Sequence, residues 1–144
     1  MNIPEPKFEF RHRTPVQIRF NDIDMFGHLN NSVYLQFADL AKMRYFMQFM
    51  DGRFDPMQLG LVVANINCDF YNPTYVQEKL EVLTAVASIA TSSLVMEQRI
   101  VNDRGQVKCI CRTIMVSFDP RTAQSVPVTD KWRHDLTAYE QREL

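Results

Sequence analysis

The residues best suited to chemistry gather in one short polar stretch, residues 22–32, which contains Asp22, Asp24, Gly27 and His28. A free aspartate ionises with a pKa of about 3.9, so its carboxylate can take a proton from water or attack a carbonyl carbon directly. Asp24 is therefore a candidate general base or nucleophile, whereas local hydrogen bonding is the better role for Asp22. Asn, Asp and Gly are dense here, which is typical of a loop, and a loop-capping role for Asp24 is the alternative.

A long apolar segment, residues 32–50, follows this loop and predicts a helix, because it contains no Gly or Pro. Its apolar residues cover more than one stripe, which indicates a helix buried nearly all round. Asn30, Asn31 or Ser32 could supply the N-cap. The first backbone N–H groups of a helix have no intrahelical partner, and the helix dipole favours an anion there. The helix could thus stabilise an oxyanion at the carbonyl that Asp24 attacks.

The remaining elements predict a sheet that curves around this helix. Alternating or β-rich segments predict strands over residues 16–20, 61–71, 79–90, 93–101 and 107–118. Asn102-Asp103-Arg104-Gly105 is a hairpin turn, and a short amphipathic helix is expected from Thr129. One buried helix followed by antiparallel hairpins indicates an α+β fold. Such a single layer leaves an edge strand, which dimerisation by edge pairing would cover.

Length and composition predict one domain over residues 1–144, with a core at about 14–120 and a helical tail at about 129–144. The formal net charge of -1 argues against a nucleic-acid partner. No run of about 18 apolar residues is present, so no membrane insertion is expected. No basic region followed by an apolar run opens the chain, so no signal peptide is expected either.

Cysteine usage and the missing motifs narrow the chemistry further. Cys109 and Cys111 stand two apart, which suits one face of a strand better than a metal site, and with Cys68 they indicate a reduced, cytoplasmic setting. No phosphate loop, dinucleotide fingerprint or Gly-x-Ser-x-Gly elbow is present. We therefore expect no metal, no cofactor and no serine nucleophile.

The thirteen residues from Asp22 to Tyr34, DIDMFGHLNNSVY, resemble the acyl-CoA thioesterases of the 4-hydroxybenzoyl-CoA thioesterase type. That family shows Asp-x-Asp-x-x-Gly, often continued as His-x-Asn-Asn-x-x-Tyr, before a long apolar helix. The resemblance implies a hotdog fold, in which a five-stranded antiparallel sheet wraps around a long central helix. It also implies a homodimer with a continuous sheet, often a homotetramer, with active sites at the dimer interface. The usual reaction splits acyl-CoA into free acid and CoA.

The resemblance also implies roles for single residues. Asp24 corresponds to the family's catalytic carboxylate, and this favours catalysis over the loop-capping alternative. Asn31 is a candidate to hold the attacking water, although some relatives have His or Tyr there, and Asn removes that ionisable helper. The other candidates for contacts with substrate are Gly27, His28, Asn30, Ser32 and Ser93, which lies in the turn between the strands predicted at 79–90 and 93–101. Packing or a loop hydrogen bond is the alternative for His28.

The substrate is expected to be a fatty-acyl-CoA, with Met43, Phe46 and Met47 lining a pocket between the helix and a partner subunit. The alternative is that these three side chains simply belong to the core. Cations for the CoA phosphates could come from four strand residues, Lys79, Arg99, Lys108 and Arg112. An acyl-carrier-protein substrate and a non-catalytic acyl-thioester binding protein are the alternatives. A hydratase ranks below them, because the paired acid and His of such enzymes lack their expected layout.

Overall fold

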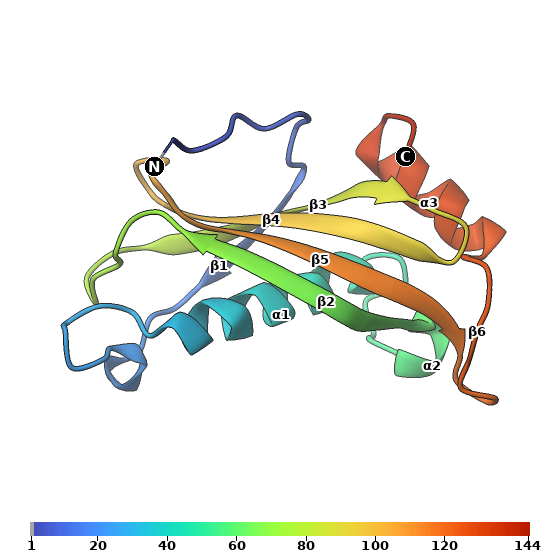
Figure 1. The fold of residues 1–144 in the computed structure, drawn as a ribbon, viewed down its shortest axis with the longest axis horizontal. Helices are drawn as coiled ribbons and strands as arrows, with labels where there is room; N and C mark the ends of the chain where they lie inside the picture. The colour runs from blue at the N-terminus through green and yellow to red at the C-terminus, as the bar shows by residue number, and fades with distance from the viewer. Residues whose placement is uncertain (1) are drawn as a thin grey trace.

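A curved antiparallel sheet wraps around one long helix in the computed structural model, which describes residues 2–144 (Figure 1). The strands are β1 (His12–Val16), β2 (Leu61–Phe70), β3 (Leu80–Ile89), β4 (Ser93–Asn102), β5 (Val107–Asp119) and β6 (Gln124–Ser125). The helices are η1 (Phe20–Asp22), α1 (Asn31–Met47), α2 (Pro56–Leu59) and α3 (Asp130–Glu140). The sheet runs β1-β3-β4-β5-β2, and the short β6 pairs with β5. This arrangement confirms the predicted hotdog fold.

Helix α1 fills the concave face of the sheet because its contact residues are either very small or large and aromatic. Ala38 and Ala41 are buried and let the helix approach the strands, whereas Tyr45 and Phe46 fill the space near its end. The Gln98 side chain reaches from β4 and donates to the carbonyl of Ala38 at 2.9 Å. This bond holds the helix on the sheet and gives the buried Gln98 amide nitrogen a partner, whereas the Gln98 Oε1 has none among residues 2–144.

Most predicted elements are confirmed to within a few residues. Helix α1 begins at Asn31 and ends at Met47, before Asp51 and Gly52 take positive φ angles of 53° and 76°. Helix α3 is capped by Thr129, whose side chain accepts from the N–H of Trp132. The short helix α2 was not predicted. Its sequence signal is Asp55, which caps the helix just before a proline that suits the first helical position.

The first strand is the element that the sequence pattern misplaced. A strand was expected over residues 16–20, but β1 covers His12–Val16 and a 3-10 turn follows at Phe20–Asp22. Val16 pairs with Leu80, the first residue of β3, so residues 17–20 have no partner strand in the described part of the chain. Phe20 is 87% exposed, and alternation alone did not reveal this.

Among residues 2–144, strand β2 has a neighbouring strand on one side only, which is β5, because the sheet order ends at β2. Its exposed side chains include large apolar ones, which are Val62, Val63, Ile66 and Phe70, at 37–45% exposure. The convex face of the sheet, which points away from α1, is crossed by the N-terminal segment (Figure 1). None of the helices in residues 2–144 is long and apolar enough to span a bilayer.

Candidate active site

The loop before α1 is a closed turn held by its own backbone. The N–H of Asp24 donates to the carbonyl of His28 at 2.8 Å, and the N–H of Gly27 donates back to the carbonyl of Asp24 at 3.1 Å. Ile23 and Leu29 form a β-bridge beneath these bonds. Gly27 has a φ of 78°, a conformation that costs a glycine little, and a Cβ there would meet no atom within 4 Å. The glycine is therefore required by the backbone rather than by crowding.

The Asp24 side chain is half-buried at the centre of this turn. Its Oδ1 accepts from the N–H groups of Phe26 at 2.9 Å and His28 at 3.3 Å. No donor among residues 2–144 reaches Oδ2. One carboxylate oxygen thus orients the side chain, and the other is left to accept a proton or to attack.

Asp22 has a local role, as its position in the loop suggested. Its buried carboxylate accepts from the backbone N–H of Arg19 at 2.8 Å and from the Arg19 guanidinium at 3.1 Å. Burial alone would raise the pKa of Asp22, but these hydrogen bonds and the charge of Arg19 hold that pKa below its usual value. The carbonyl of Asp22 accepts the N–H of Asn30 at 2.9 Å, so this residue ties the loop to the start of α1.

The first turn of α1 offers one open backbone donor. The Oδ1 of Asn30 accepts both the N–H and the hydroxyl of Ser32, each at 2.9 Å. The N–H of Val33 is taken by the carbonyl of Asn30 at 2.9 Å. No acceptor among residues 2–144 takes the N–H of Asn31, and both Asn31 and Ser32 are exposed. Of the first N–H groups of α1, the one of Asn31 is therefore the candidate to bind an oxyanion.

A second segment, residues 72–78, contacts the site loop from the side, and nothing in the sequence pattern pointed to this contact. The carbonyl of Thr74 accepts the N–H of Leu29 at 2.8 Å. The Thr74 hydroxyl accepts from the phenol of Tyr34, in the first turn of α1, also at 2.8 Å. His28 packs edge-on against Tyr75 at 5.4 Å between ring centroids, a packing contact rather than a pairing with a carboxylate.

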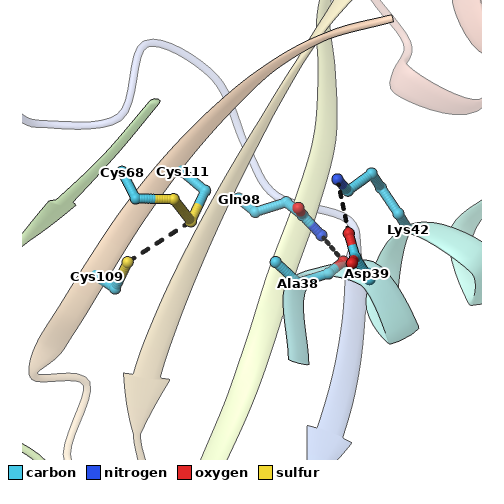
Figure 2. Close-up of a disulfide and its surroundings, with 7 residues drawn as sticks. All are labelled: Ala38, Asp39, Lys42, Cys68, Gln98, Cys109 and Cys111. Carbon is cyan, nitrogen blue, oxygen red and sulfur yellow. Dashed lines mark hydrogen bonds and ion pairs between the residues drawn. A yellow bond between two sulfur atoms is a disulfide. The ribbon is translucent and has the colours of Figure 1, made fainter. Parts of the chain in front are cut away.

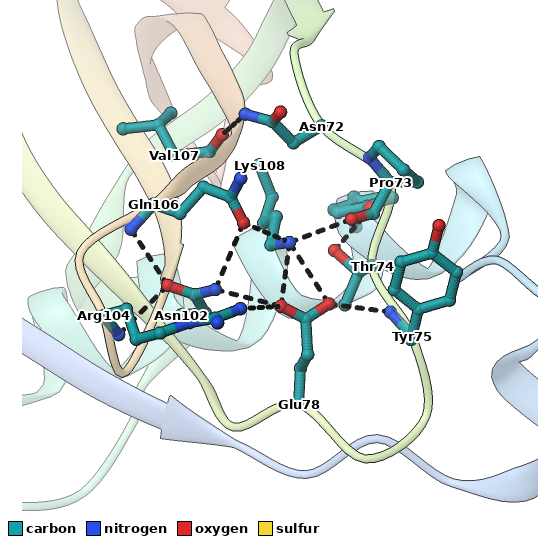
Figure 3. Close-up of polar contacts among 11 residues, drawn as sticks. Asn72, Pro73, Thr74, Tyr75, Glu78, Asn102, Arg104, Gln106, Val107 and Lys108 are labelled. Carbon is teal, nitrogen blue, oxygen red and sulfur yellow. Dashed lines mark hydrogen bonds and ion pairs between the residues drawn. The ribbon is translucent and has the colours of Figure 1, made fainter.

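Segment 72–78 is itself fixed by a buried ion pair, which Figure 3 shows at the centre of a polar cluster. The Lys108 side chain is only 2% exposed, and its Nζ lies 2.9 Å from Oε1 of Glu78 and donates to the carbonyl of Pro73 at 2.9 Å. Glu78 also accepts from the Asn102 side chain at 2.9 Å and from the N–H of Tyr75 at 2.8 Å. We call Glu78 and Lys108 the clamp pair.

The clamp pair corrects one expectation about cations. Lys108 was a candidate for CoA phosphates, but it is buried and fully engaged. Arg99 is also buried, beside Glu97 on the convex face. Lys79 and Arg112 are exposed, so they remain candidates for binding phosphate.

Comparison with known proteins now decides the family. Residues 18–136 match the family model described as the thioesterase-like superfamily. The chain belongs to this superfamily. The acyl-CoA thioester hydrolase YbgC of Escherichia coli O157:H7 is 27% identical over 110 residues, which cover 75% of this chain and 82% of YbgC. The uncharacterized protein YsmA of Bacillus subtilis is 26% identical over 136 residues, 94% of this chain and 92% of YsmA.

Solved structures agree with this family. A thioesterase from Thermus thermophilus, in complex with coenzyme A and Zn, superposes with a TM-score of 0.82 at 28% identity. The match covers 94% of this chain and 98% of that one. The predicted membership among hotdog thioesterases is thus confirmed.

Ser93 is not brought to the loop within one thioesterase chain. It opens β4, at the end of the sheet where α1 finishes, whereas Asp24 lies at the end where α1 starts (Figure 1). The β3–β4 turn contacts α3 instead, since Arg133 donates to the carbonyl of Thr91 at 3.1 Å. A contact of Ser93 with substrate stays a prediction.

The predicted apolar pocket is partly present in the single thioesterase chain. A cavity of about 220 Å³ lies between α1 and β2, and Met43, Phe46, Leu61 and Val63 line it. Met47 is not among its lining residues. Leu59 lies between this cavity and a second one of about 590 Å³, and it lines both. Trp132 and Phe118 also line the second cavity.

The cysteines of the thioesterase are arranged differently from the expectation. Cys109 and Cys111 do share one face of β5, but Cys68 lies opposite Cys111 on β2 and the two are joined as a disulfide. The expectation that all three cysteines are free, reduced thiols is therefore wrong for this structure. Sequence alone could not find this pairing, because it depends on the register of β2 against β5.

Proposed function

We propose that the chain hydrolyses acyl-CoA thioesters to free acid and CoA. The observation that carries this proposal is the Asp24 carboxylate, oriented by two backbone N–H groups in the loop that leads into the open N–H of Asn31. The names of two relatives, the acyl-CoA thioester hydrolase YbgC and the long-chain acyl-CoA thioesterase FadM of Escherichia coli, support a CoA substrate.

In the proposed reaction, Asp24 acts through its free Oδ2. It either takes a proton from the attacking water or attacks the carbonyl carbon to give an acyl anhydride that water then opens. The Asn31 N–H binds the carbonyl oxygen as negative charge develops on it, and one such donor contributes about 10² to 10³ in rate. The Asn31 side chain is exposed beside this donor and would hold the water. The thiolate of CoA leaves.

We infer that the acyl group is an extended aliphatic chain. From Asn31 to Met43 the helix rises about 18 Å, so a chain lying along it from the site reaches the cavity beside Met43 and Phe46. Those two side chains are large and apolar, and methionine adapts its shape readily to a ligand. A short acyl group would leave this cavity unfilled.

We infer further that two copies pair through β2, because that strand has an unpaired edge bordered by exposed apolar side chains. Pairing would cover Ile66 and Phe70 and close the acyl cavity on the β2 side. Dimers could associate into a tetramer. A cytoplasmic location, where CoA esters are made and used, stays a prediction, and the Cys68–Cys111 link removes the cysteine argument for it.

The test is hydrolysis of a panel of acyl-CoAs and an acyl carrier protein ester, following free thiol and subtracting the protein's own cysteines. Asp24→Asn keeps an oxygen that can accept from Phe26 and His28, so the loop should persist while the charge is lost. We expect turnover to fall by roughly 10² to 10⁴ in this variant. A variant as active as wild type would reject the role of Asp24.

One alternative retains an argument from the structure. The bonds of Asp24 Oδ1 are also what a purely structural aspartate would make, which favours a non-catalytic acyl-thioester binding protein. The same panel separates the two. Saturable binding of acyl-CoA without turnover would establish the binding role, and selective turnover of the carrier-protein ester would change the substrate class.

A further inference from the structure

Two cavities follow one another along α1, and the Leu59 side chain lines both of them. The first, of about 220 Å³, lies beside Met43 and Phe46, and we call it the near cavity. The second, of about 590 Å³, lies beside Phe49 and Met50, and we call it the far cavity. The N–H of Phe49 donates to the carbonyl of Phe46 at 3.1 Å, so the helical winding continues between the two. The far cavity therefore lies further from the active-site loop than the near one.

We propose that Leu59 sets the upper limit on the length of the acyl chain. Its side chain separates the near cavity, which receives the acyl chain, from the far cavity, which has room for a longer one. The far cavity is then a second acyl subsite, closed in the wild type and opened when residue 59 is made smaller. This inference rests on the function proposed above, because it concerns the substrate of that reaction.

The near cavity suits an alkyl chain although two charged residues of α1 line it. The Nζ of Lys42 lies 3.2 Å from the carboxylate of Asp39, and Figure 2 shows the two groups pointing toward each other. The Lys42 side chain is 6% exposed, so this pairing neutralises a charge that burial would otherwise leave without a partner. The other residues that line the near cavity are all apolar.

The far cavity offers apolar surface of the same kind. Large apolar side chains form much of its lining, namely those of Phe49, Met50, Met57, Phe118 and Trp132. Polar residues such as Gln58 and Lys131 also line it, and both are exposed to solvent. Each methylene that leaves water for an apolar cavity strengthens binding about fourfold. A chain that passed Leu59 would therefore gain affinity with each methylene that enters the far cavity.

Leu59 keeps its place between the cavities because its backbone is held by two other elements. The indole Nε1 of Trp132, on α3, donates to the carbonyl of Leu59 at 3.0 Å. The next residue, Gly60, has a φ of 58°, and its carbonyl accepts the N–H of Phe118 on β5 at 2.9 Å. The peptide on the C-terminal side of Leu59 is thus anchored to α3 and β5. The backbone cannot move aside to admit a longer chain, so the size of the side chain decides whether one passes.

The first measurement is kcat/KM of the full chain for octanoyl-, dodecanoyl-, hexadecanoyl- and eicosanoyl-CoA. We expect Leu59→Ala to raise kcat/KM for the longest chains relative to the medium ones by about 10- to 100-fold. Leu59→Val removes less of the side chain and should shift the ratio in the same direction, which covers the case that Leu59→Ala does not fold. Leu83→Ala is the matched control, because Leu83 is also half-buried but lines a different cavity, beside the N-terminal segment.

A second substitution shows whether the longer chain enters the far cavity. Val126 lines the far cavity and not the near one, so Val126→Phe narrows the far cavity alone. Added to Leu59→Ala, it should abolish the gain for long chains, and in the wild type it should leave the chain preference unchanged. A Leu59→Ala variant with the wild-type preference, or a gain that survives Val126→Phe, would overturn the proposal.

The chain has one tryptophan, Trp132, and it lines the far cavity, so its fluorescence gives a readout that needs no turnover. The probe is a long-chain fatty acid with bromine on its terminal carbon, which quenches indole fluorescence on contact, and the same acid without bromine is the blank. We expect quenching in Leu59→Ala but not in wild type or Leu83→Ala.

The two readouts separate the subsite from the reaction. Quenching confined to Leu59→Ala, without hydrolysis of any acyl-CoA, would retain the subsite and reject the hydrolase proposal. Hydrolysis by every variant with no quenching in Leu59→Ala, or with equal quenching in wild type, would reject the role of Leu59 and leave the hydrolase proposal in place.

Discussion

The backbone N–H of Asn31 can be removed without changing the fold around it. Asn31 is the first residue of α1, where proline is well tolerated, and Asn30 before it is extended with φ -63° and ψ 138°, as a residue preceding proline prefers. We predict that Asn31→Pro lowers kcat by about 10² to 10³ while the helix content by circular dichroism is unchanged.

Asn31→Ala is the matched control for this variant, because it loses the same side chain but keeps the N–H. If both variants lose activity equally, the Asn31 side chain rather than its amide carries the effect. If neither loses activity, the oxyanion is held elsewhere.

At this scale, residue types made Asp24 a candidate, and only the resemblance to the thioesterases favoured catalysis over loop capping. The structure places Asp24 in one loop with Gly27 and Asn30. The sequence could not distinguish Asn31 from Ser32 as the open donor. The open donor depends on which backbone N–H the Asn30 side chain binds. Three consecutive residues could have been the N-cap, so the sequence did not show which N–H is bound.

At the scale of elements, the clamp pair holds segment 72–78 on the sheet. Burial would raise the pKa of Glu78, but hydrogen bonds from Lys108 and Asn102 lower it to about 2. A carboxyl whose pKa is lower in the folded protein adds stability above its unfolded value, and that stability is lost as the pH falls towards 2. We predict that Glu78→Gln destabilises the protein by about 3 kcal/mol at pH 7, because Lys108 keeps a buried charge without its partner.

Urea unfolding at pH 7 and pH 3 measures this effect, with Glu81→Gln as control, since Glu81 pairs with Arg13 at the partly exposed edge. The gap between wild type and Glu78→Gln should narrow at pH 3. A gap that is as wide at pH 3, or absent at pH 7, would contradict the assignment of the pair.

Helix α3 brings a second buried carboxyl to the sheet. Glu140 Oε1 accepts from the N–H of Val86 at 3.1 Å, where β3 bulges, and from the Tyr45 phenol at 3.3 Å. Burial raises the pKa of Glu140. The folded protein therefore binds this proton more tightly than the unfolded chain, and stability falls as the pH rises from about 4.5 through the raised pKa.

We predict that Glu140→Gln, which keeps an acceptor for Val86 and removes the charge, flattens this dependence and raises the thermal midpoint at neutral pH. Thermal melts between pH 4 and pH 8 measure it. A parallel pH profile in wild type and variant would show that Glu140 does not carry the dependence.

The sequence predicted well the elements whose own apolar residues give a clear helical or strand pattern, namely α1, α3 and the long strands. The misplaced β1 and the unforeseen clamp pair have a common cause. Both depend on where β3 and β5 begin relative to other strands, and this register cannot be read from local alternation.

At the scale of the whole molecule, a single sheet layer was expected to leave an edge strand. The sheet order leaves two, β1 and β2, and β2 is the longer one, with exposed large apolar side chains. Which side chains border its edge was not predicted. A lysine among these side chains would place two positive charges, one from each copy, in a β2–β2 pair. Natural edge strands use charged side chains in this way to prevent edge-to-edge pairing. We predict that wild type is a dimer or tetramer and that Ile66→Lys shifts it to monomer, measured by light scattering after gel filtration.

Met57→Lys is the control, because Met57 is 58% exposed on α2 and outside the strand. It should leave the oligomer intact. If the acyl cavity is completed by the partner copy, Ile66→Lys also loses hydrolysis in parallel with the dimer, and raising the protein concentration restores both. A monomeric wild type with full activity would show that one chain holds a complete site, and the cavity beside Met43 would then have to bind the acyl chain unaided.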